Sequence, residues 1–291
     1  MIVLEHGAPQ IEKLSGRDTL CPSHLAENGM YQSIIAELDD SVGILTLNRA
    51  ERHNTFDEQL VDELTRALLV FEADPRVRVV VLSATGKSFC AGADLNWMKR
   101  AASAPMQENL REARLFGRLL MTLNELAKPT VARIQGPVYG GGMGLVAACD
   151  IAIASYDALF ALTEVKLGLI PSVASPFVLA AIGERHCRRY MLTAERFSAA
   201  EAYRIGLVHE VVPGDEQLDE AVGEVVDVLL KNGPQALAEC KALLRVIAGQ
   251  PIDESTLEES AQRITHVRAS PEGQEGLKAF LEKRKANWIG G

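Results

Sequence analysis

The sequence predicts an α/β fold in which strands and helices alternate along the chain. Up to about residue 175, short apolar runs of strand length are separated by longer segments with helical spacing of apolar residues. Alternation at this spacing indicates crossover connections between strands. After residue 176 the pattern becomes mostly helical, so a helical region follows the mixed part of the chain.

Most of the expected strands lie in the first half of the chain. Residues 34–48 predict a β-hairpin with its turn at residues 39–41. Asp57 can cap a helix that runs to about residue 73 with its apolar residues on one face. The β-branched run at residues 77–83 is typical of a strand buried on both faces. Further strands are expected at residues 130–134, 151–154 and 159–162, and further helices at residues 109–126 and 145–149.

The second part of the chain is expected to be helical apart from one strand at residues 208–212. The expected helices cover residues 199–205, 217–231, 234–247, 254–268 and 272–285. Their apolar faces must be buried against the α/β core or against a neighbouring subunit. We therefore divide the chain into a core at residues 30–205 and a mainly helical region at residues 206–291 that serves oligomerisation.

Residues 1–29 show no periodicity. They lack the apolar core of a secretory signal, and their acidic residues argue against a transit peptide. We expect an unstructured or non-core extension. A disordered extension, a fusion remnant and an upstream start codon are all compatible with this segment.

Composition excludes several classes of protein. Hydrophobic residues make up 47% of the chain and charged residues 24%, as in ordinary soluble proteins. The net charge of −9 argues against a nucleic-acid partner, and no apolar run reaches the roughly 18–20 residues of a membrane span. No spacing resembles a metal site. The scattered cysteines indicate reduced, buried thiols in a cytoplasmic protein: Cys21, Cys90, Cys149, Cys187 and Cys240.

Two glycine-containing segments are the candidates for a catalytic site. Residues 135–145 contain three consecutive glycines and open into the helix expected at residues 145–149, whereas residues 88–95 directly follow a strand. Each segment could present a backbone N–H to one shared oxygen, and a pair of such donors makes an oxyanion hole. The alternative is that both segments are ordinary turns or tight packing points.

Four motifs follow one another along the chain: Phe89-Cys90-Ala91-Gly92-Ala93-Asp94, Gly136-x-x-x-Gly140-Gly141-Gly142, Cys149-Asp150-Ile151 and Glu164-x-x-Leu167-Gly168-Leu169-x-Pro171. In this order they resemble the enoyl-CoA hydratase/isomerase (crotonase) family, over roughly residue 34 to the C-terminus. The resemblance implies the crotonase fold, a spiral of β-β-α units with a C-terminal helical region. It also implies that the core binds an acyl-CoA thioester, with coenzyme A as part of the substrate and no separate cofactor.

The resemblance implies catalytic roles for three residues. The backbone N–H groups of Ala93 and Gly141 would hold the thioester oxygen and stabilise an enolate, and Glu164 would act as the acid and base. Many hydratases of the family have a second glutamate where this chain has Gly144, which cannot transfer protons. The implied substrate-binding residues are Ala91, Asp94, Gly140, Gly142, Gly144, Arg49, His53, Trp97, Phe280 and Lys283.

The residues around these motifs resemble one branch of the family, the bacterial 3-methylglutaconyl-CoA hydratases of leucine degradation. That branch adds water to a β-branched enoyl-CoA and forms 3-hydroxy-3-methylglutaryl-CoA. The alternatives are an isohexenylglutaconyl-CoA hydratase of acyclic terpene degradation and an enoyl-CoA isomerase. A catalytically silent or RNA-binding scaffold is the non-enzyme alternative, against which Glu164 and the acidic charge both argue.

Basic residues are candidates for binding the charged parts of such a substrate. Lys99, Arg100, Arg111 and Arg114 are candidates for its distal carboxylate, although each can equally be an ordinary surface charge. By resemblance, Arg49, Arg52 and His53 border CoA, and Phe280 and Lys283 reach it from a neighbouring subunit. The resemblance also implies a homotrimer, which many members of the family pair into a homohexamer.

Overall fold

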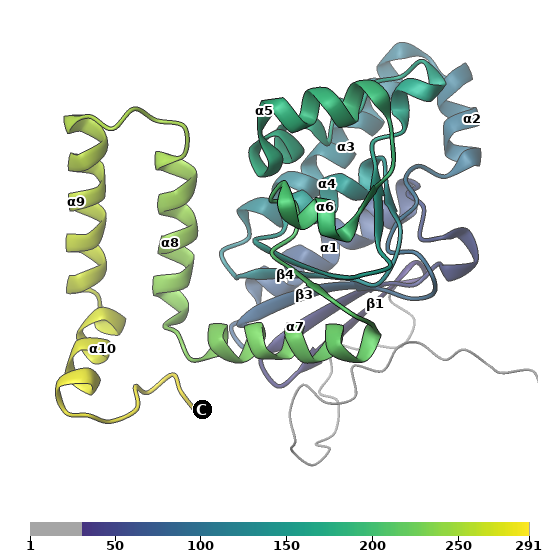
Figure 1. Ribbon diagram of the computed structural model, residues 1–291. Helices are drawn as coiled ribbons and strands as arrows, with labels where there is room; N and C mark the ends of the chain where they lie inside the picture. Colours follow the sequence, from purple (N-terminus) through teal and green to yellow (C-terminus); the bar gives the residue numbers. More distant parts are fainter. Residues whose placement is uncertain (1–30, 291) are drawn as a thin grey trace, which may run out of the picture.

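The computed structural model describes residues 31–290, and a six-stranded sheet forms the centre of this part of the chain (Figure 1). Its strands follow the order β1 (Ile34–Asp39), β2 (Val42–Leu47), β3 (Val79–Ala84), β4 (Thr130–Ile134), β6 (Ile151–Ser155) and β9 (Glu210–Val212). β1 and β2 form the expected antiparallel hairpin, and all later strands pair in parallel. The strands β2, β3 and β4 are buried along their whole length, which explains their continuous apolar runs.

A smaller sheet joins β5 (Val138–Tyr139), β7 (Leu159–Ala161) and β8 (Phe197–Ser198). A bridge between Cys90 and Val138 extends this sheet towards the segment that follows β3. The chain therefore passes three times from the large sheet through the small sheet into helix, starting from β3, β4 and β6 in turn. The predicted spiral of β-β-α units is present.

Helices cover both faces of the large sheet. α1 (Glu58–Ala73), α3 (Met106–Glu125), α4 (Gly141–Ala148) and α5 (Ser175–Thr193) lie on one face, and α7 (Asp215–Leu230) lies on the other (Figure 1). The core against α7 includes Val79, Val81 and Val131, whereas Val80, Leu82 and Ala132 of the same strands face the opposite way. Such alternation follows from the two-residue period of a strand.

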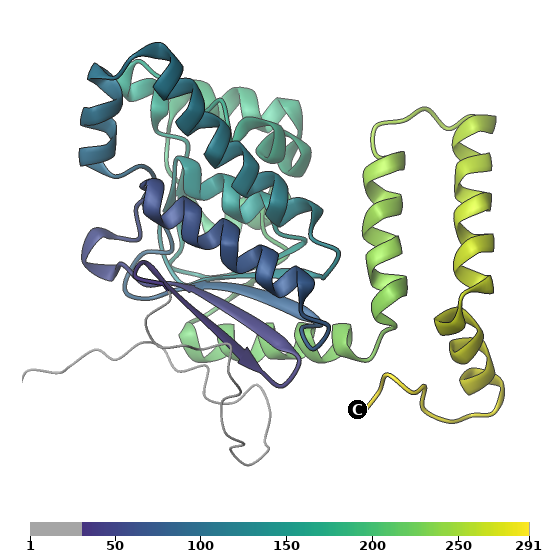
Figure 2. The same ribbon diagram turned by 180° about the vertical axis from the view of Figure 1, so that it is seen from behind.

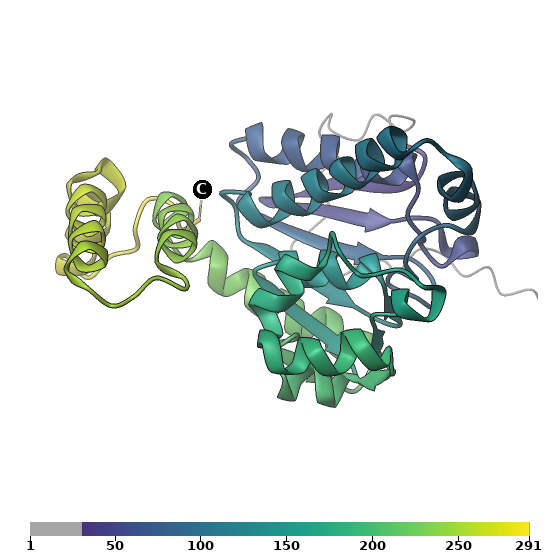
Figure 3. The same ribbon diagram turned by 90° about the horizontal axis from the view of Figure 1, so that it is seen from above.

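Three C-terminal helices form a separate arm beside the sheet (Figures 2 and 3). They are α8 (Pro234–Ile247), α9 (Glu254–Ala269) and α10 (Pro271–Leu281), and no residue of α8 or α9 is buried. Arg78 ties this region to the core, because its guanidinium donates to the carbonyls of Leu230, Asn232 and Trp288. A role of the region from residue 206 in oligomerisation stays a prediction. The extension expected at residues 1–29 lies outside the described residues.

Near the glycine segments, one helix was not predicted and two others begin earlier than expected. α2 (Leu95–Ser103) directly follows Asp94, whose carboxylate caps it, and α3 begins at Met106 rather than at residue 109. α4 begins at Gly141, four residues early, although glycine is a poor helix former. Tertiary packing overrides helix propensity here. Gly142 lies so close to Cys90 that a β-carbon at position 142 would come within 2.8 Å of the Cys90 carbonyl oxygen.

The described cysteines only partly match the expectation of buried thiols. Cys90, Cys149 and Cys187 are buried free thiols, but Cys240 is exposed on α8, and Cys21 lies outside the described residues. Burial raises the pKa of Cys90 to about 12, so at neutral pH this thiol is protonated and packs as a small apolar group. Within residues 31–290, none of the helices combines the length and apolar character that crossing a bilayer requires.

Candidate active site

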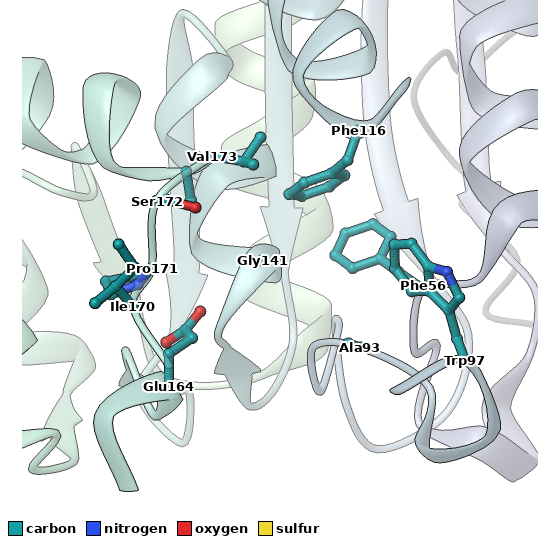
Figure 4. Close-up of a pocket in the computed structure, with 11 residues that line it drawn as sticks. Phe56, Ala93, Trp97, Phe116, Gly141, Glu164, Ile170, Pro171, Ser172 and Val173 are labelled. Atoms are coloured by element: carbon teal, nitrogen blue, oxygen red, sulfur yellow. The ribbon is translucent and has the colours of Figure 1, made fainter. Parts of the chain in front are cut away.

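A pocket of about 160 Å³, partly open to solvent, lies where the two glycine segments meet (Figure 4). Figure 4 shows two facing walls, with the rings of Phe56, Trp97 and Phe116 on one side and Glu164 on the other. Gly141 lies between them. The lining residues are Phe56, Ala93, Trp97, Phe116, Gly141, Glu164, Ile170, Pro171, Ser172, Val173 and Ala174.

Ala93 is held at the pocket by a bridge to Phe56. The N–H of Phe56 donates to the Gly92 carbonyl, and the N–H of Asp94 donates to the Phe56 carbonyl, both at 2.7 Å. These bonds use the groups on either side of Ala93 and leave its own N–H without an acceptor among the described residues. Gly92 has φ +95°, a conformation that favours glycine, so the loop can make this turn.

Gly141 is the first residue of α4, where backbone N–H groups have no partner within the helix. No acceptor for its N–H is found among the described residues. A β-carbon at this position would lie 3.0 Å from Phe116 Cζ and 3.1 Å from Phe56 Cε2. Glycine therefore keeps the amide accessible beside the two rings, and the positive end of the helix favours negative charge there.

The two segments are joined by backbone hydrogen bonds. The N–H of Tyr139 donates to the Cys90 carbonyl at 2.8 Å, and the N–H of Cys90 donates to the Pro137 carbonyl at 3.2 Å. These bonds explain how residues far apart in sequence bring two free N–H donors, those of Ala93 and Gly141, to one pocket. The arrangement provides the donors that an oxyanion hole needs.

Glu164 is the carboxylate of the pocket and begins the short turn η2 (Glu164–Leu167). Its Oε2 is buried and has no hydrogen-bond partner. Its Oε1 lies 3.1 Å from the position that a β-carbon on Gly140 would occupy. Burial raises the pKa of Glu164, and hydrogen bonds from the backbone offset only part of that rise. A carboxylate with a raised pKa is a stronger base than an exposed one, as proton transfer requires.

Gly144 packs closely against its neighbours, so a side chain there would require them to shift. A β-carbon would lie 2.8 Å from Leu120 Cδ1 and 3.0 Å from Ala174 Cβ. Gly140 is similarly constrained, because it has φ +52° and its β-carbon would press on Glu164. The predicted binding residues Gly140, Gly142 and Gly144 thus allow close backbone packing around the pocket, which they do not themselves line.

Asp94 and Trp97 contribute to the site in different ways. Asp94 caps α2 by accepting hydrogen bonds from the N–H groups of Asn96 and Trp97. Burial alone would raise the pKa of Asp94, but these hydrogen bonds hold it below the ordinary value. Trp97 lines the pocket with its ring, and its Nε1–H donates to the buried Glu112 at 2.6 Å.

The predicted CoA-binding cations have unequal surroundings. Arg49 is buried and pairs with Asp57 at 2.6 Å, so its charge is largely compensated within the protein. Arg52 is exposed nearby, and His53 Nδ1 lies 3.0 Å from the Ser88 hydroxyl. Ala91, also predicted to bind substrate, donates its N–H to the His53 carbonyl.

Other predicted residues do not line the pocket of this chain. Lys99 and Arg100 are exposed on α2, and Arg111 and Arg114 are exposed on α3. Phe280, 80% exposed, belongs to the C-terminal arm, and Lys283 follows in the same region. Any role of Phe280 and Lys283 at a neighbouring subunit's site stays a prediction.

Several residues of the site were not predicted. Phe56, Phe116 and the segment from Ile170 to Ala174 line the pocket, and that segment begins at the end of the motif that starts with Glu164 and extends three residues beyond it. Asn54 donates to the carbonyls of Thr85 and Ser88, and thereby fixes the segment that leads to Ala93. A buried asparagine carries no sequence signal for this role, because only the folded chain brings its partners together.

Comparison with known proteins adds to this geometry. The family model described as enoyl-CoA hydratase/isomerase matches residues 37–291. A crystal structure of an enoyl-CoA hydratase from Shewanella pealeana is 42% identical, with a TM-score of 0.86, covering 89% of this chain and 97% of that one. Crotonyl-CoA hydratase from Syntrophomonas wolfei is 33% identical over 89% of this chain and 98% of its own length. Mitochondrial enoyl-CoA hydratase from Pongo abelii is 32% identical over 92% of each chain.

Proposed function

The chain belongs to the enoyl-CoA hydratase/isomerase family, and from that premise we propose that it adds water to the double bond of an enoyl-CoA thioester. The activity is that of a carbon–oxygen lyase. One observation carries the proposal: the carboxylate of Glu164, whose Oε2 is buried without a partner, shares an otherwise largely apolar pocket with the unpaired N–H groups of Ala93 and Gly141.

The geometry supports separate roles for the carboxylate and for the two backbone N–H groups. Glu164 takes a proton from water while the water oxygen bonds to the β-carbon of the substrate. The electron pair of the double bond moves to the α-carbon and thioester oxygen, and the N–H groups of Ala93 and Gly141 stabilise the resulting enolate. Glu164 then returns its proton to the α-carbon, so one water is added and the protein is unchanged.

We propose 3-methylglutaconyl-CoA as the substrate and 3-hydroxy-3-methylglutaryl-CoA as the product, as in leucine degradation. The residues flanking Ala93, Gly141 and Glu164 support this choice, and the apolar rings of the pocket suit a methyl branch. No cationic side chain among the described residues lines the pocket, so the distal carboxylate must extend beyond it. The exposed cations of α2 and α3 are candidates to meet it there: Lys99, Arg100, Arg111 and Arg114.

An enoyl-CoA isomerase is the second candidate. A single carboxylate favours it, because moving a double bond requires only that one base carry a proton between two carbons. An isohexenylglutaconyl-CoA hydratase would use the same chemistry on a longer acyl chain.

The test is a comparison of substrates with the purified full chain. Crotonyl-CoA, 3-methylglutaconyl-CoA, isohexenylglutaconyl-CoA and a 3-enoyl-CoA are incubated separately, and the products are identified by mass. We expect addition of water, with the highest kcat/KM for 3-methylglutaconyl-CoA. Conversion of the 3-enoyl-CoA without gain of water would favour the isomerase. If none of the four substrates reacted, the result would favour the non-enzyme alternative, a catalytically silent scaffold.

A further inference from the structure

The pocket offers very few polar side chains to a reacting water. Among its described lining residues, only Glu164, Ser172 and Trp97 carry a polar side-chain group. The indole N–H of Trp97 already donates to Glu112. Glu164 and Ser172 are therefore the lining side chains left to hold a water molecule.

Gly144 supplies no second carboxylate to the site. Leu120 and Ala174 already occupy the space beside this residue, at 2.8 and 3.0 Å from where a β-carbon would stand. Ala174 belongs to the same segment as Ser172, and both residues line the pocket. This wall thus fills the space beside position 144 and presents a hydroxyl two residues before Ala174.

The backbone of Ser172 is fixed while its hydroxyl is free. Its N–H donates to the Ile170 carbonyl at 2.8 Å, and its own carbonyl accepts from the Ser175 hydroxyl at 2.7 Å. The Ser172 hydroxyl makes no hydrogen bond to any described residue. Figure 4 shows that this hydroxyl and the Glu164 carboxylate enter the cavity from the same wall, opposite the aromatic rings.

We infer that Ser172 is a second catalytic residue, which holds the reacting water beside Glu164. The inference rests on the proposed hydratase function. The water donates one hydrogen to the Glu164 carboxylate and the other to Ser172 Oγ, so that an oxygen lone pair faces the β-carbon. Ser172 transfers no proton; Glu164 takes the proton from water and later returns it to the α-carbon.

The inference is tested by separating hydration from enolate formation. Hydration of the best enoyl-CoA is one readout, and exchange of the α-protons of butyryl-CoA in heavy water is the other. Exchange needs Glu164, Ala93 and Gly141 but no water at the β-carbon. The variants are Ser172→Ala, Ser172→Thr, which keeps the hydroxyl, and Ser255→Ala, a control that removes an exposed hydroxyl on α9, outside the pocket.

We expect Ser172→Ala to lower kcat for hydration about 10–100-fold, the scale of one lost hydrogen bond to a reacting group, while exchange stays near wild type. Ser172→Thr should restore most of the hydration rate, and Ser255→Ala should change neither readout. Unchanged hydration in Ser172→Ala, or an equal loss of both readouts, would overturn the inference and leave the hydratase function standing. Wild-type protein that exchanges protons but hydrates no enoyl-CoA would overturn the proposed function, and the inference with it.

Discussion

Glu164 is held in surroundings that oppose its charge. Its carboxylate has one buried oxygen without a partner, and the neighbouring rings and aliphatic side chains offer no compensating cation. Burial therefore raises its pKa. Structural roles favour satisfied carboxylates, whereas perturbed ones concentrate at functional sites.

This burial predicts that Glu164→Gln is more stable than the wild type near pH 8. The folded protein binds the Glu164 proton more tightly than the unfolded chain does, so this group favours folding below its ordinary pKa of 4.5. That contribution is lost as the pH rises through the raised pKa, and glutamine avoids the loss. Urea unfolding at pH 8 and pH 5 should show a stability advantage for the variant that shrinks at the lower pH.

Glu37→Gln is the matched control, because Glu37 is exposed on β1 and its replacement should change stability little at either pH. An advantage of Glu164→Gln that is the same at both pH values would contradict a cost of burying the charge.

α2 is the element that connects the first oxyanion donor to the aromatic wall. Its cap, Asp94, follows Ala93 directly and binds the N–H of Trp97, so one carboxylate links the oxyanion donor to the aromatic wall. Asp94 does not line the pocket, so contact with the substrate does not explain the aspartate at this position. Its role as the cap of α2 does.

Asp94→Ala is expected to cost about 0.5–2 kcal/mol of stability through loss of the cap. It should also lower kcat/KM about tenfold or more, since Ala93 and Trp97 lose their alignment. Asp253→Ala is the control, because Asp253 caps α9 through Thr256 N–H and lies outside the pocket. Denaturant unfolding and hydration kinetics of both variants test this. Equal losses of activity in the two would show that α2 has no special role.

The elements show how far sequence reasoning reaches. The hairpin, the buried strand β3 and the helix α8 were predicted within a few residues, because their apolar periodicity is strong. α4 was placed four residues too late, because consecutive glycines signal a loop while packing against Cys90 imposes a helix. The pocket wall at Ile170 to Ala174 was missed, because its contacts with α3 and α4 exist only in the folded chain.

At the scale of the whole molecule, the C-terminal arm exposes several large apolar side chains. The exposed apolar residues of α8, α9 and α10 include Leu244, Leu257, Ile264, Leu277, Phe280 and Leu281. Large apolar side chains that stay exposed on neighbouring helices favour an interaction surface. We propose that they pack in a homotrimer or homohexamer, as the family resemblance implies, with Phe280 and Lys283 beside a neighbouring subunit's site.

Phe280→Asp is expected to weaken this assembly, because a carboxylate would be buried in an apolar contact. Phe280→Leu keeps the apolar character and serves as the control. Sedimentation equilibrium should show a trimer or hexamer for the wild type and the control, and smaller species for Phe280→Asp. A monomeric wild type would refute the proposed assembly.

The central claim, that one carboxylate performs hydration in this molecule, is tested most directly by the turnover of Glu164→Gln on the best enoyl-CoA substrate. The variant keeps the size of the side chain and removes its ability to exchange a proton. We predict a normally folded protein, judged by circular dichroism and unfolding, whose kcat is at least about 100-fold below wild type. A folded Glu164→Gln with near wild-type turnover would contradict the account.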